Sequence, residues 1–75
     1  MQATNTLGAV LHVRFEGRSL DIPLAVLGVE PGSADARIRQ ALAEHLDLPV
    51  EQLRYYVIDR HETGNMTVRP EAVFG

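Results

Sequence analysis

The side chains that could carry out chemistry in this 75-residue sequence are few and widely spaced: three histidines, two serines and no cysteine. Zinc needs three or four nitrogen or sulfur ligands that converge on one point. His12, His45 and His61 fall in three separate segments and have no cysteine beside them. We therefore expect no metal site and no cofactor.

Nucleophilic catalysis finds equally little support. Ser19 and Ser33 belong to no motif that joins a nucleophile to a histidine base and an orienting acid. Asp59, His61 and Glu62 are close together, but they fall at the tip of an expected hairpin, where solvated charges are common. We therefore expect that the chain is not an enzyme.

Length and composition predict one small domain over residues 1–75, with 1–7 frayed and 71–75 available as a tail. The chain is 45% hydrophobic and 23% charged, which is typical of globular proteins. A chain of this size buries only about 60% of its unfolded surface, which leaves little room for a deep pocket.

Charge and hydropathy exclude several classes of function. The net charge is -3, all seven basic residues are arginines, and no basic stripe is present. The chain therefore lacks the electrostatic attraction to phosphates on which nucleic-acid binding depends. No apolar run is long enough to span a membrane, and the first eight residues do not resemble a signal peptide. Together with the absence of cysteine, this predicts a monomer in the reducing cytoplasm that binds neither nucleic acid nor membrane.

Alternating apolar and polar residues predict a first hairpin from strands 11–16 and 20–24. A two-residue loop at Gly17-Arg18 would place Phe15 opposite Leu20, with Gly17 taking the positive φ of a type II′ turn. Pro23 cannot donate a ladder hydrogen bond, so the second strand should lie at a sheet edge.

A helix is expected from about Ser33, as its cap, to about Asp47, and Leu48-Pro49 ends it. One stripe would pack on the sheet, and the opposite side would face solvent. The stripe consists of Ile38, Ala41, Leu42 and Leu46, and the solvent side of Arg37, Arg39, Gln40 and Glu44.

Two more strands are expected at 53–60 and 66–69, joined by a turn around Gly64. Alternation from Leu53 would point Leu53, Tyr55 and Val57 to the helix. It would leave Arg54, Tyr56, Ile58 and Arg60 on the opposite face. The order ββαββ packs most simply as an α+β domain, a mixed four-stranded sheet with the helix across one face and the first and last strands parallel in the middle. This is the β-grasp arrangement.

The segment 48–57, Leu-Pro-Val-Glu-Gln-Leu-Arg-Tyr-Tyr-Val, resembles the stretch of ubiquitin that follows its central helix. The resemblance implies a ubiquitin-like modifier whose C-terminal glycine is adenylated by an activating enzyme, handed to a conjugating enzyme and joined to a target protein. Gly75 is the matching residue, and Phe74 stands where such modifiers usually have a second glycine. Lacking a side chain, glycine lets the carboxylate enter a narrow active site.

Partner contacts are expected through the face of the sheet opposite the helix and through the chain end. The expected contact residues are Arg54, Tyr56, Ile58, Arg69 and Phe74. Aromatic and arginine anchors of this kind are typical of interfaces. Two alternatives stay open, a β-grasp interaction module that is never conjugated and a sulfur carrier whose terminal glycine becomes a thiocarboxylate.

Overall fold

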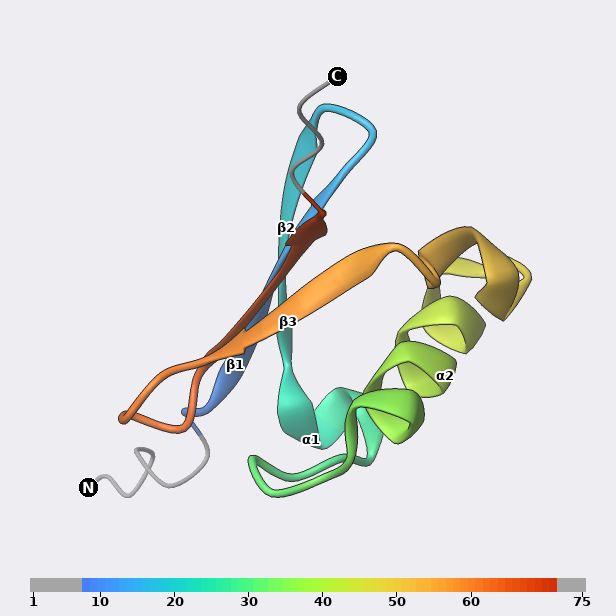
Figure 1. Cartoon of the computed structure of the whole chain (residues 1–75). Coiled ribbons are helices and arrows are strands. Elements are labelled where there is room, and N and C mark those ends of the chain that lie inside the picture. The colour runs from blue at the N-terminus through green and yellow to red at the C-terminus, as the bar shows by residue number, and fades with distance from the viewer. Residues whose placement is uncertain (1–7, 72–75) are drawn as a thin grey trace.

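A computed structural model describes residues 8–71 as a four-stranded mixed sheet with one main helix, an α+β arrangement (Figure 1). The elements in chain order are β1 (Val10–Phe15), β2 (Arg18–Pro23), α1 (Leu24–Leu27), α2 (Asp35–Leu46), the 3-10 helix η2 (Val50–Leu53), β3 (Tyr56–Arg60) and β4 (Met66–Pro70).

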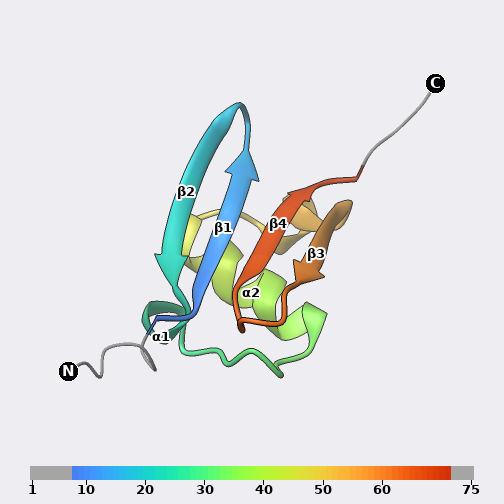
Figure 2. The same ribbon diagram turned by 90° about the vertical axis from the view of Figure 1, so that its left-hand side faces the viewer.

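The strand order is β2-β1-β4-β3, with β1 and β4 parallel at the centre and the other pairs antiparallel. This confirms the predicted parallel central pair, and it confirms that the strand ending in Pro23 lies at an edge. Helix α2 covers one face of the sheet, and Figure 2 shows the other face turned toward the viewer with no helix in front of it.

The first hairpin turns at Glu16-Gly17, one residue earlier than predicted. Both residues have positive φ, 52° and 79°, as a type I′ turn requires. The observed register pairs Val13 with Leu20, so the predicted pairing of Phe15 with Leu20 is wrong by two residues. Because side chains alternate with period two, an even shift leaves the apolar residues on the predicted face.

Helix α2 begins without the predicted serine cap. Ala34 occupies the N-cap position and no side chain caps the helix. The Ser33 hydroxyl instead accepts a hydrogen bond of 2.9 Å from the backbone N–H of Glu30, within the preceding loop. At the other end Asp47 has a φ of 61° and closes the helix in the left-handed conformation.

The third strand begins at Tyr56, three residues later than predicted. Leu53 is fully buried, but from the 3-10 helix η2 rather than from a strand. Alternation counted from Leu53 is therefore out of phase: Tyr56 and Ile58 pack against the core on the helix side, and Tyr55 is 64% exposed. The predicted placement of Tyr56, Ile58 and Arg60 on the face opposite the helix is wrong, and so is that of Tyr55 and Val57 toward the helix.

The core fills the space between the sheet and α2. Its fully buried large side chains come from the two central strands, α2 and η2: Leu11, Val13, Ile38, Leu42, Leu53, Met66 and Val68. Phe15 from β1 and Tyr56 from β3 extend this layer, with ring centroids 5.9 Å apart.

Arginines fasten the helix side of the sheet to its neighbours. Arg60, at the end of β3, donates hydrogen bonds of 2.7 Å to the carbonyls of Pro31 and Ser33 and pairs with the Asp35 carboxylate. The loop that leads into α2 is thereby tied to the edge of the sheet. Arg39, expected to face solvent, instead donates a hydrogen bond of 3.0 Å from Nη2 to the Tyr56 carbonyl.

Candidate functional site: the open face of the sheet

We use the term open face for the sheet surface opposite α2. Its side chains alternate along each strand with the buried ones, which fixes their direction. They are Ser19, Asp21 and Pro23 from β2, Val10, His12 and Arg14 from β1, Thr67 and Arg69 from β4, and Val57 and Asp59 from β3. The open face is therefore mostly polar.

One row of the open face holds an acid, a histidine and a hydroxyl side by side. His12 Nδ1 lies 2.8 Å from Asp21 Oδ1, and His12 is paired in register with Thr67 on β4. The Thr67 hydroxyl is already hydrogen-bonded to His61 Nε2, at 2.9 Å. The side chains of His12 and Asp21 are 45% and 71% exposed, so water solvates the pair. The row has the residue types of a nucleophile triad but lacks the enclosure that activates one.

Metal binding receives no support within residues 8–71. No three of the histidine, aspartate and glutamate side chains in this range gather closely enough to hold an ion.

Two arginines lie on the open face just past the end of the parallel pairing. Val13 and Val68 are partners in the parallel pairing of β1 with β4, so Arg14 and Arg69 are the next residues along the two strands. Arg69 Nε donates a hydrogen bond of 2.8 Å to Asp59 Oδ2, diagonally across β3 and β4. No carboxylate of residues 8–71 pairs with Arg14.

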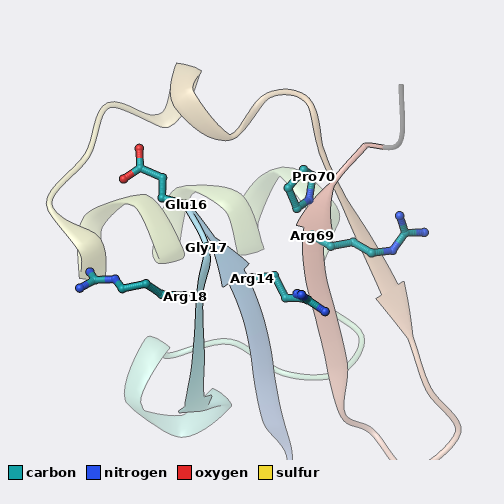
Figure 3. A pocket seen from close by; sticks show the side chains of 6 residues that line it. All are labelled: Arg14, Glu16, Gly17, Arg18, Arg69 and Pro70. Atoms are coloured by element: carbon teal, nitrogen blue, oxygen red, sulfur yellow. The ribbon is translucent and has the colours of Figure 1, made fainter. Parts of the chain in front are cut away.

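A shallow hollow of about 330 Å³ lies beside these arginines, between the β1–β2 turn and the end of β4 (Figure 3). It exists because β1 and β4 separate beyond their last paired residues (Figure 2). Its lining consists of Arg14, Glu16, Gly17, Arg18, Arg69 and Pro70. Three of the seven arginines of the chain therefore contribute to the lining, and Figure 3 shows the Arg18 side chain extending away from Arg14 and Arg69.

The predicted contact residues do not form one surface. Arg69 lies on the open face, whereas Tyr56 and Ile58 pack on the helix side. Arg54 follows η2 and is exposed, with its guanidinium carbon 4.9 Å from the centre of the Tyr55 ring. Gly75 and Phe74 lie outside the described residues.

Comparisons with protein-family models, with curated proteins and with solved structures find no match for this chain. Its function is therefore inferred from its own residues and geometry. None of the helices between residues 8 and 71 has the length and apolar character needed to cross a lipid bilayer.

Sequence reasoning missed Arg14 and Arg18 as site residues, although part of the signal was present. Alternation in the first strand already places Arg14 opposite the core residues Val13 and Phe15. Placing it beside Arg69 also requires the register of the parallel pair, which three-dimensional packing determines.

Proposed function

We propose that this chain is a ubiquitin-like β-grasp protein that acts as a modifier, with the carboxyl group of Gly75 activated by a partner enzyme and joined to a target. The observation that carries the proposal is the strand order β2-β1-β4-β3, with parallel central strands and α2 across one face. The resemblance of segment 48–57 to ubiquitin supports it independently of that topology.

The proposal sets how close a partner must come to the described part of the chain. The Glu71 N–H donates a hydrogen bond of 2.9 Å to the carbonyl of Tyr55, the residue before β3, so the last described residue lies beside the start of that strand. Residues 72–75 follow this attachment, and four extended residues span at most about 14 Å. The proposal therefore requires the active site of the partner to come within this distance of Glu71.

The chemistry requires a glycine on this chain and ATP from outside it. The Gly75 carboxylate attacks the α-phosphorus of ATP, forming an acyl adenylate and releasing pyrophosphate. A thiol or amine of the partner then attacks the acyl carbon and expels AMP. Glycine has no side chain to hinder that attack.

The absence of lysine restricts the products. No side-chain amine of this chain can accept the acyl group of a second copy. The N-terminal amine is the one amine left, so conjugation to amines should give single attachments or linear fusions, without branching through a lysine of the modifier.

The proposal is tested by incubating the chain with ATP and candidate activating enzymes and measuring intact mass. We expect a covalent adduct with the wild type and none after deletion of Gly75. Gly32→Ala is the matched control, because Gly32 has no positive φ and no atom within 4 Å of an added Cβ, and it should form adducts normally.

Adducts that persist after deletion of Gly75 would contradict the proposal. A wild-type mass that changes only by replacement of one oxygen with sulfur would contradict the modifier function and assign the chain as a sulfur carrier instead.

A further inference from the structure

We infer that Arg14 and Arg69 on the open face form a docking site for an extended, carboxylate-rich segment of a partner protein. The two arginines follow the paired residues Val13 and Val68 on neighbouring strands. Beyond this pair the two strands separate, and both arginines remain on the same face of the sheet. The ion pair of Arg69 with Asp59 is exposed and contributes little to folding, so an anionic partner gains more from these cations than the fold does.

The local charge contrasts with that of the whole molecule. The chain has a net charge of -3, yet the hollow is lined by three arginines, Arg14, Arg18 and Arg69, against Glu16 in the lining and Asp59 beside Arg69. An acidic partner is repelled by most of such a molecule and attracted to this region. Charge complementarity of this kind orients a partner and accelerates its association.

The shape of the hollow favours a protein segment over a small molecule. Small-molecule sites bury about 70–90% of their ligand. Here five of the six lining residues are exposed and only Arg69 is half-buried, so a small ligand would remain largely in water. A segment that lies across the face gains contacts on either side of the hollow as well.

An extended strand presents alternate carboxylates to one surface. Alternate side chains of a strand point to the same side and are about 6.6–7 Å apart. Two alternate carboxylates can therefore engage Arg14 and Arg69 together, each through the two parallel hydrogen bonds that a guanidinium offers. Val57, paired with Arg69 across β3 and β4, lies on the side of Arg69 away from Arg14 and provides an apolar contact beside these charges.

Arg69 already has a carboxylate partner, which shows that the geometry accepts one. Its Nε donates to Asp59 Oδ2, and both side chains remain over 40% exposed. Arg14 has no such partner among the described residues, so it is the side chain from which a docking segment gains most.

The inference is tested by fluorescence anisotropy with a labelled peptide in which aspartate alternates with valine. We expect the wild type to bind it, with an affinity that falls as salt is added. Arg14→Gln should weaken binding about tenfold, which corresponds to about 1.4 kcal/mol. Arg37→Gln removes the same charge from an exposed position on α2 and should weaken binding less than about twofold.

Three outcomes would overturn the inference. The first is that the peptide does not bind at low salt. The second is that Arg14→Gln and Arg37→Gln weaken peptide binding equally. The third is that inorganic phosphate, at the same concentration as the peptide, displaces the peptide. A single-stranded oligonucleotide that binds more tightly than the peptide, with the same loss in Arg14→Gln, would assign the surface to nucleic acid instead. None of these measurements involves Gly75, so the result is independent of the proposed conjugation.

Discussion

The two faces of the same sheet differ in what their side chains do. On the helix side, Leu11 and Val13 from β1 and Met66 from β4 are 1% exposed or less. On the open face, His12 and Arg14 alternate with those leucine and valine residues and remain in contact with water. One strand thus contributes to folding with one face and leaves the other available for binding.

The polar contacts of the two faces differ as well. On the helix side, Arg60 and Arg39 donate to backbone carbonyls of other elements, and these contacts fix how the loop and α2 lie against the sheet. On the open face, the Arg69–Asp59 pair joins two strands that the backbone ladder already holds together. Exposed pairs of this kind contribute little, typically below about 1 kcal/mol. Loss of an open-face charge should therefore affect recognition more than stability.

The largest expected effect comes from the core beneath α2. Leu42 is fully buried, and Leu42→Ala should lower the free energy of unfolding by about 3 kcal/mol because it removes buried methyl groups and leaves a cavity. Urea unfolding followed by circular dichroism measures this loss. If that variant does not fold, Ile38→Val is measured instead, because it removes one buried methylene group and should lower the free energy of unfolding by only about 1 kcal/mol.

Thr67→Val is the matched change on the open face, since it keeps a branched side chain in β4. The change removes the exposed hydrogen bond between the Thr67 hydroxyl and His61 Nε2, so we expect it to lower the free energy of unfolding by no more than about 1 kcal/mol. Equal losses in Leu42→Ala and Thr67→Val would contradict the division of roles between the two faces.

A smaller effect is expected from the arginine that holds the loop before α2. Arg60→Gln loses the contacts to Pro31, Ser33 and Asp35 and should lower the free energy of unfolding by about 1 kcal/mol, since the group is 37% exposed and partly screened. Faster amide exchange at the Ser33 N–H, which donates to the Glu30 carbonyl, would show that the loop has loosened.

Arg37→Gln removes the same charge from α2 without breaking an ion pair among the described residues. It should leave both the stability and the exchange rate close to those of the wild type. An Arg60→Gln variant as stable as Arg37→Gln, with unchanged exchange, would show that Arg60 does not hold the loop.

Much of the fold could be predicted from local patterns. Alternation in the first strand and the helical stripe through Ile38 and Leu42 each identify a buried face without any long-range information. Pro23 marks an edge strand because its nitrogen has no hydrogen to donate. These features depend on a residue's own chemistry and its near neighbours, and the structure confirms them.

The errors arose where two conformations fit the same local pattern. Leu53 is apolar and followed by aromatic and branched residues, which is typical of a strand. It lies instead in the 3-10 helix η2, from which its side chain enters the core. That 3-10 helix reverses the phase of the following strand and moves Tyr56 to the core. Likewise, the placement of Arg14 beside Arg69 depends on a parallel register between strands far apart in sequence.

The most direct test of the account is a measurement of stability and binding on one preparation of the double variant Arg14→Gln/Arg69→Gln. We predict that the free energy of unfolding changes by less than about 0.5 kcal/mol, while affinity for the aspartate-valine peptide falls more than tenfold below that of the wild type. A loss of several kcal/mol in stability, or an affinity equal to that of the wild type, would contradict the separation of folding and recognition between the two faces.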